Sequence, residues 1–140
     1  MTTIPAIFFR NMRLLGILSI LLSLITWGVD LADLVYHCPY CRMQRSVIGL
    51  LGILMLLPNP HHWLARYWAA VFGVLGLVVA ATQHFNGWKK VFAGTFELGP
   101  NWYVNSFILS GFAILIIVGQ LKLIHEGPHK DLAPAEPIPA

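Results

Sequence analysis

Four long apolar runs, separated by short polar or proline-containing connections, dominate this chain of 140 residues. They cover approximately residues 14–34, 39–57, 64–83 and 103–124. A helix of about 20 apolar residues is long enough to cross a hydrocarbon core of about 30 Å. Each run is therefore predicted to cross a membrane as a helix.

The residue composition agrees with a membrane location. Hydrophobic residues make up 57% of the chain and charged residues only 11%, whereas soluble domains carry about 25% charged residues. The nine lysines and arginines are spread over the termini and the short connections, without a continuous basic stripe. We interpret them as anchors at the bilayer surface, and nucleic acid is not a predicted partner.

The connections predict how the crossings follow one another. Pro58 and Pro60 separate the second and third runs, and because proline cannot continue a helix, these runs are predicted to be antiparallel neighbours. The first run follows Arg10 and Arg13, as a signal peptide would, but its apolar stretch is too long and no small-residue cleavage site follows it. The predicted fold is therefore an all-α membrane protein, a four-transmembrane-helix up-and-down bundle over residues 14–124.

Three segments lie outside the predicted crossings. Residues 1–13 form a predicted cytoplasmic segment, and residues 125–140, which contain four prolines, form a predicted disordered cytoplasmic tail. The predicted outer loop, residues 84–102, carries apolar side chains at helical spacing beside two lysines, which predicts a short helix lying in the membrane interface. These apolar residues are Trp88, Val91, Phe92 and Phe96.

The two cysteines of the chain, Cys38 and Cys41, share one Cys-Pro-Tyr-Cys sequence between the first and second runs. Proline is favoured at the first position of a helix, so Pro39 is predicted to open the second crossing, with Cys38 near its cap and Cys41 in its first turn. The helix dipole favours a thiolate at that position. Two thiols at this spacing can close a disulfide and reopen it.

Polar residues follow the cysteines at helical spacing. Gln44 and Arg45 lie three and four residues after Cys41, and therefore on the same helical face. His84 ends the third crossing on the same side of the predicted membrane.

Small residues suggest how these helices meet. Gly49 and Gly52 leave a shallow groove where another helix or a flat ring could approach the backbone. The third crossing has a similar small-residue face, which could pack against that groove. This face consists of Ala69, Gly73, Gly76 and Ala80.

Basic residues give the orientation in the membrane. Those on one side are Arg10, Arg13, Arg66, Lys122 and Lys130, and those on the other are Arg42, Arg45, Lys89 and Lys90. If Arg42 and Arg45 are retained for the chemistry of the cysteines, the first group is clearly larger. The positive-inside rule then places both termini in the cytoplasm, and the cysteines face the outer, oxidising compartment.

The segment Cys-Pro-Tyr-Cys-Arg-Met-Gln-Arg, residues 38–45, resembles the Cys-x-x-Cys-x-x-Gln/Glu-Arg signature of the bacterial disulfide-bond-formation protein B family. In that family the signature also stands at the start of a second membrane helix. Glycines after the motif, Arg66-Tyr67 at the start of the third crossing and His84 at its end agree with the resemblance. The likeness covers the four-helix body, residues 14–124.

This resemblance implies an oxidoreductase of the bacterial inner membrane. Such a protein passes electrons between a protein dithiol and ubiquinone or menaquinone through the loop cysteines. Carried over, Cys38 would exchange with the incoming thiol and Cys41 would lie against the quinone. Arg45 would stabilise the thiolate and the charge of the reduced quinone, and Gln44 and His84 would hydrogen-bond near the quinone oxygens. The implied partner is a periplasmic thioredoxin-like dithiol protein or another exported thiol protein.

The chain departs from the family in its outer loop. Typical members carry a second cysteine pair there, whereas residues 84–102 contain no cysteine. The substrate thiol would then attack Cys38 directly, a separate protein would supply the missing pair, or the scaffold would serve another task.

Two other functions remain open from the sequence. One is a non-catalytic four-helix subunit of a larger membrane complex. The other is a metal-handling protein that uses Cys38, Cys41 and His37 as soft ligands, although two thiolates and one imidazole leave a zinc site incomplete. Covalent haem attachment is disfavoured because Arg42, and not histidine, follows Cys41.

Overall fold

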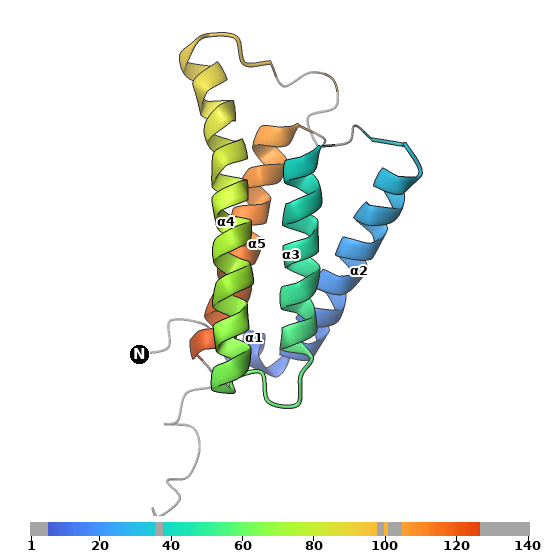
Figure 1. The fold of residues 1–140 in the computed structure, drawn as a ribbon, viewed down its shortest axis with the longest axis vertical. Helices are drawn as coiled ribbons and strands as arrows, with labels where there is room; N and C mark the ends of the chain where they lie inside the picture. The colour runs from blue at the N-terminus through green and yellow to red at the C-terminus, as the bar shows by residue number, and fades with distance from the viewer. Residues whose placement is uncertain (1–5, 36–37, 98–99, 101–104, 127–140) are drawn as a thin grey trace, which may run out of the picture.

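The computed structural model describes residues 6–35, 38–97, 100 and 105–126, and the regular secondary structure of these residues is entirely helical. The predicted all-α fold is therefore confirmed. Long helices run side by side, and a short helix lies at one end of them (Figure 1). In chain order the helices are α1 (Ala6–Arg10), α2 (Met12–Leu31), α3 (Pro39–Met55), α4 (Trp63–Phe92) and α5 (Ser106–Glu126).

Within the described part of the chain, three helices are long and apolar enough to cross a membrane: α2, α4 and α5. Helix α3 differs from them because it has 17 residues and carries Arg42 and Arg45 in its first half. At 1.5 Å per residue it is about 26 Å long, which is shorter than a hydrocarbon core of about 30 Å. The structure thus supports three of the four predicted crossings, and the fourth is not confirmed.

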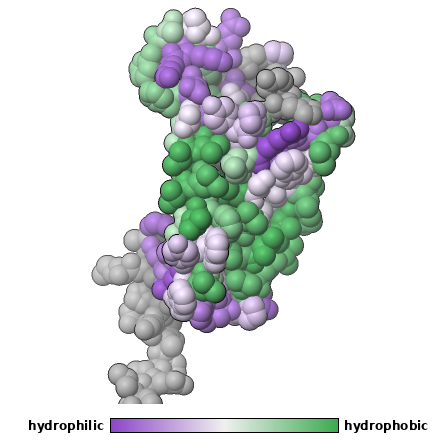
Figure 2. Space-filling view, viewed as in Figure 1, coloured by the Kyte–Doolittle hydropathy of each residue, from purple (hydrophilic) through white to green (hydrophobic). Residues whose placement is uncertain are grey.

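The surface of the helices is apolar around the middle. Figure 2 shows hydrophobic residues over the central part of the visible face and polar residues gathered toward both ends. Large side chains such as Leu24, Ile25 and Leu115 are more than 60% exposed. Exposed apolar side chains at mid-height are stable against lipid but not against water.

Glycines set the contact between α2 and α3. A Cβ atom on Gly52 would lie 2.9 Å from the carbonyl oxygen of Gly16, and one on Gly49 would lie 2.6 Å from the Oγ atom of Ser23. The backbones of α2 and α3 therefore approach closely at these positions, as small residues allow. The groove predicted at Gly49 and Gly52 is filled by α2.

The small-residue face of α4 packs elsewhere. A Cβ atom on Gly76 would meet Val47 of α3 and Ile117 of α5, and one on Gly73 would meet Leu121 of α5. The predicted packing of this face against Gly49 and Gly52 was wrong, because α3 presents its glycines to α2 and its aliphatic side chains to α4. Val47 and Ile117 belong to the buried core that α3, α4 and α5 share.

Helix α4 also continues beyond the predicted crossing. It runs without a break from Trp63 to Phe92, so the first half of the predicted outer loop, residues 84–102, is part of α4. The predicted separate interfacial helix was wrong, since Trp88 and Phe92 lie on the last turns of α4. Ala93 caps the end of α4, and Gly94 follows with a φ of 74°, which favours glycine.

Helices α2, α3 and α5 begin and end within three residues of the corresponding predicted runs, 14–34, 39–57 and 103–124. Helix α1 lies within the predicted segment 1–13, and α5 includes His125 and Glu126 of the predicted tail. Residues 103–104, the start of the fourth predicted crossing, lie outside the described residues. So does the rest of the tail, residues 127–140.

Candidate thiol site

The two cysteines lie at the beginning of α3, as predicted. Cys38 is the N-cap residue with an extended backbone (φ −99°, ψ 117°), and Pro39 occupies the first turn. The Sγ atom of Cys38 accepts a hydrogen bond of 3.5 Å from the backbone N–H of Cys41, which is the usual role of an N-cap side chain. Both cysteines are free thiols and are half-buried.

A single side-chain amide contacts both sulfur atoms. The Nε2 group of Gln83, on α4, donates to Sγ of Cys38 at 3.5 Å and to Sγ of Cys41 at 3.4 Å. The two sulfurs therefore lie close together on one side of this amide. Gln83 is 6% exposed, so its amide takes the place of water beside the thiols.

Gln44 holds Gln83 in this orientation. Its Nε2 group donates to Oε1 of Gln83 at 2.6 Å, between two buried side chains. Because the oxygen of Gln83 accepts from Gln44, its nitrogen must face the sulfurs. The predicted site residue Gln44 thus reaches the cysteines through Gln83.

The guanidinium group of Arg45 is turned mainly toward α2. Nη1 of Arg45 donates to the carbonyl oxygen of Thr26 at 2.6 Å and to Oδ2 of Asp30 at 3.1 Å, and Nε donates to the carbonyl oxygen of Cys41 at 3.2 Å. Arg45 is therefore fixed at the cysteine turn by a backbone bond and at α2 by an ion pair.

Asp30 joins two arginines of α3 to α2. Its side chain is fully buried, and it accepts from Nε of Arg42 at 2.8 Å and from Nη2 of Arg42 at 3.1 Å, in addition to Arg45. One buried carboxylate thus accepts from both guanidinium groups. Both guanidinium groups also lie within 6 Å of the Trp27 ring, a distance at which a cation is attracted by the aromatic face.

His84 lies apart from the thiols. Its Nδ1 atom is 3.0 Å from the carbonyl oxygen of Phe107 and 3.2 Å from Oγ of Ser110, and its ring stacks on the Phe107 ring at 4.4 Å between centroids. The imidazole thus packs against α5. The structure brings Cys38, Cys41, Gln44 and Arg45 together and places His84 on a different side of α4.

A wide cavity of about 700 Å³ opens beside the two sulfurs. Its walls come from the ends of α2, α3, α4 and α5, and they include Cys38, Cys41 and Gln83. Polar side chains such as Asn86 and Lys90 also line this cavity. A polar substrate could therefore reach the sulfurs from this side.

A second cavity, of about 310 Å³, reaches Cys41 from between α2, α3 and α5. Its polar lining includes Gln44 and Arg45, and the remaining wall is largely apolar, with Ile48 and Phe112 among the lining side chains. Cys41 and Arg45 line both cavities. Cys41 thus lines one cavity with several polar side chains in its wall and a second cavity that is almost entirely apolar.

Sequence reasoning missed Gln83 and Asp30. Gln83 directly precedes the predicted residue His84. The rotation of α4 about its axis determines which of these two side chains faces α3, and it is Gln83. Asp30 is an acidic residue within an apolar run, and such residues usually face the interior and mark a functional position. That signal was present in the sequence, eight residues before Cys38.

No cluster of three or more metal-ligating side chains (His, Cys, Asp, Glu) occurs among the residues that the structure describes. His37, the third ligand of the metal hypothesis, lies outside those residues. The described geometry therefore adds no ligand to the two thiols.

No family model matches this chain, and no curated protein or solved structure is similar to it. The resemblance of residues 38–45 to the disulfide-bond-formation signature therefore rests on that motif and on the sequence features around it.

Proposed function

We propose that this protein is a membrane thiol–disulfide oxidoreductase related to the disulfide-bond-formation protein B family, with a quinone as its electron acceptor. The position of Cys41 carries the proposal, because this residue lines both the wide cavity, which has polar side chains in its wall, and the smaller apolar cavity. A protein thiol is polar and comes from water, whereas a quinone is apolar and comes from the bilayer. A residue that passes electrons between them needs access to both.

The proposed reaction has two balanced steps. In the first, the thiols of Cys38 and Cys41 give two electrons and two protons to a quinone, which forms the Cys38–Cys41 disulfide and hydroquinone. In the second, an exported protein dithiol attacks that disulfide by thiol–disulfide exchange. The protein dithiol leaves as a disulfide, and Cys38 and Cys41 are thiols again. Cys38, which lines the wide cavity and not the apolar one, is the sulfur that exchanges with the partner.

The residues around the apolar cavity suit a quinone ring. Gln44 and Arg45 carry N–H donors, which match the two carbonyl oxygens of a quinone, and Ile48 and Phe112 match its apolar ring. Among the described residues, Arg45 donates hydrogen bonds through Nε and Nη1. Its Nη2 group has no bond to these residues and can donate to a ligand. Ubiquinone and menaquinone both have the required carbonyl pair.

The proposed membrane arrangement has four crossings, with both termini in the cytoplasm and the thiols at the periplasmic face of a bacterial inner membrane. Helix α3 would then cross as the short, central helix between α2 and α4. Its arginines lie in its first half, where the Asp30 ion pairs offset their charge. Buried ionisable residues in membrane helices usually pair in this way.

The direct test of the proposed function is oxidation of the thiols by a quinone. Reduced protein is mixed without oxygen with a short-chain ubiquinone analogue, and free thiols and hydroquinone are measured together. We expect two thiols lost for each hydroquinone formed, and no reaction in Cys41→Ser. Unchanged thiols with an excess of quinone would contradict the proposal and would favour the non-catalytic subunit.

The orientation has a test of its own. Because the chain has only two cysteines, a thiol reagent that cannot cross membranes reports the side on which they lie. We expect labelling of intact spheroplasts at Cys38, and none in Cys38→Ser/Cys41→Ser. Labelling only after the membrane is broken would place the thiols in the cytoplasm.

A further inference from the structure

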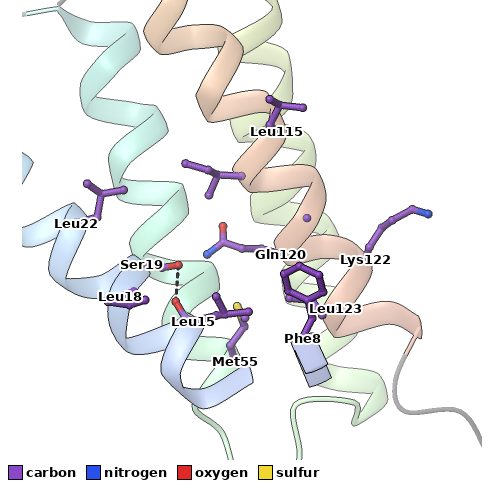
Figure 3. Close-up of a pocket in the computed structure, with 12 residues that line it drawn as sticks. Phe8, Leu15, Leu18, Ser19, Leu22, Met55, Leu115, Gln120, Lys122 and Leu123 are labelled. Atoms are coloured by element: carbon purple, nitrogen blue, oxygen red, sulfur yellow. Dashed lines mark hydrogen bonds between the residues drawn. The ribbon is translucent and has the colours of Figure 1, made fainter. Parts of the chain in front are cut away.

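A third cavity, of about 480 Å³, lies between α2 and α5 at the end of the bundle away from the thiols (Figure 3). Its wall is largely apolar and includes leucines of both helices, and Phe8 of α1 lies at one end. Leu22 and Ile116 line both this cavity and the apolar cavity at Cys41. The two cavities are therefore neighbours along the same seam between α2 and α5.

Gln120 places a buried polar group in this apolar cavity. The side chain is 4% exposed, and Figure 3 shows it projecting from α5 into the gap between α5 and α2. Its Nε2 group donates to the carbonyl oxygen of Ile48 at 3.1 Å. Its Oε1 atom has no hydrogen-bond partner among the described residues.

The orientation of this amide is determined by its neighbour. A carbonyl oxygen only accepts hydrogen bonds, so the amide nitrogen of Gln120 must face Ile48, and the amide oxygen points away from that carbonyl and is buried at the cavity wall. A buried acceptor without a donor costs free energy, and each such group in a native structure needs an explanation. The explanation we consider is a ligand that brings a donor.

A ligand of this cavity needs an apolar body, to match the walls, and a hydrogen-bond donor, to match Oε1 of Gln120. Acyl and isoprenoid chains fit apolar walls but have no hydrogen-bond donor. An oxidised quinone has only acceptors, so its oxygens would repel Oε1 of Gln120. A hydroquinone has the same apolar ring and two O–H donors, and it meets both requirements.

We propose that the cavity at Gln120 binds hydroquinone, the reduced product of the reaction proposed for Cys41, through an O–H bond to Oε1 of Gln120. This inference rests on the proposed function for the source of the ligand. Ala113 lines the cavity at Cys41 and Gln120 lines the third cavity, and between these positions a helix rises about 10 Å. A hydroquinone bound at Gln120 has left the cavity at Cys41, so a new quinone can enter the cavity at Cys41.

The test compares a hydroquinone with its dimethyl ether, which has the same ring without the donors. Binding of decylubiquinol and of its 1,4-dimethyl ether is measured by calorimetry in nanodiscs, with Cys38→Ser/Cys41→Ser protein to prevent electron transfer. We expect the hydroquinone to bind about tenfold more tightly, which is the usual worth of one hydrogen bond to a buried acceptor. In the same protein with Gln120→Leu, we expect the two ligands to bind equally.

Two results would overturn the inference. One is equal binding of both ligands to the protein with Gln120, as expected if a water molecule alone satisfies Oε1. The other is a preference for hydroquinone that persists in Gln120→Leu, which would place the preference at the Cys41 cavity.

A second variant keeps the inference testable if Gln120→Leu does not fold. Gly119 lines the same cavity, and a Cβ atom there would meet nothing within 4 Å. Gly119→Leu should therefore fold and fill part of the cavity, with at least a tenfold loss of hydroquinone affinity. Unchanged affinity would contradict the inference.

The proposed function and this inference can fail separately. If quinone does not oxidise the thiols but the preference for hydroquinone depends on Gln120, the proposed function fails and the binding site stands. If quinone oxidises the thiols and no such preference exists, only the second site fails.

Discussion

Near its beginning, α3 makes ionic contacts on the side that faces α2 and neutral hydrogen bonds on the side that faces α4. Toward α2, Arg42 and Arg45 form ion pairs with the buried carboxylate of Asp30. Toward α4, the neutral amides of Gln44 and Gln83 lead to the two sulfurs. The ionic contacts tie α3 to α2, whereas the side-chain donor that contacts the two sulfurs is the neutral amide of Gln83. Asp30 and the arginines thus hold the helices of the site together, and Gln83 touches the sulfurs.

The largest predicted effect lies on the α2 side. Asp30→Ala leaves the guanidinium of Arg45 without its buried carboxylate, and breaking a buried ion pair in this way costs about 3 to 5 kcal/mol. We expect a large drop in the thermal unfolding midpoint in detergent, measured by the loss of helical circular dichroism.

Glu97→Ala is the matched control for this change. It removes the same formal charge by the same substitution at an exposed residue outside the ion-pair cluster. We expect a much smaller change in the midpoint. Equal effects of the two substitutions would mean that overall charge, and not the buried ion pair, decides the stability.

The glycine contact between α2 and α3 lies on the same side of α3, further from the cysteines. Gly52→Ala places a Cβ atom against the backbone of α2, and overpacking of this kind costs about 1 to 3 kcal/mol. Gly28→Ala adds the same methyl group to α2 where nothing lies within 4 Å and should leave the unfolding midpoint nearly unchanged. If both variants unfold alike, the close approach of α2 and α3 is not what stabilises their contact.

A smaller predicted effect concerns the α4 side. Gln83→Leu removes the N–H donor from both sulfurs and the acceptor from Gln44, and an unsatisfied buried amide costs about 1 to 3 kcal/mol. Alkylation of the thiols at fixed pH should also slow, because a donor that favours the thiolate is lost. The rate is measured with a maleimide under reducing pretreatment.

The double variant Gln44→Leu/Gln83→Leu separates these two consequences. It should recover part of the stability, since replacing both partners leaves neither unsatisfied, while the alkylation rate stays low. Recovery of the rate together with the stability would show that Gln83 acts on the sulfurs only through the fold.

The smallest effect is predicted for His84, which packs on Phe107 and not on the thiols. His84→Phe keeps an aromatic ring in the stack and should leave the alkylation rate and the quinone reaction unchanged. A slower quinone reaction with an unchanged unfolding midpoint would show that His84 contributes to the quinone reaction.

Much of the fold follows from the sequence because it depends on local patterns. Apolar runs of sufficient length predicted the helices, and Pro39 predicted the beginning of α3 with Cys38 as its cap. The continuation of α4 to Phe92 was missed because the polar residues around His84 look like the end of a crossing. Nothing there stops a helix, however, and Gly87 is tolerated within it.

The site was predicted less completely than the fold because its contacts join different helices. The spacing from Cys41 to Gln44 and Arg45 is local, and these residues are indeed neighbours. Whether Arg45 faces the sulfurs or Asp30 depends on the rotation of α2 against α3, which the glycine contacts determine. Whether Gln83 or His84 faces α3 likewise depends on how α4 packs, and sequence spacing does not give that.

The central claim is that a quinone ring binds next to Cys41 on the side of α2 and α5, away from α4. Mapping the site with a photoreactive ubiquinone analogue tests it most directly. The account predicts labelled peptides from α3 and α5 that contain Ile48 or Phe112, with labelling suppressed by excess unlabelled quinone. Suppressible labelling confined to α4, or labelling that excess quinone does not reduce, would contradict it.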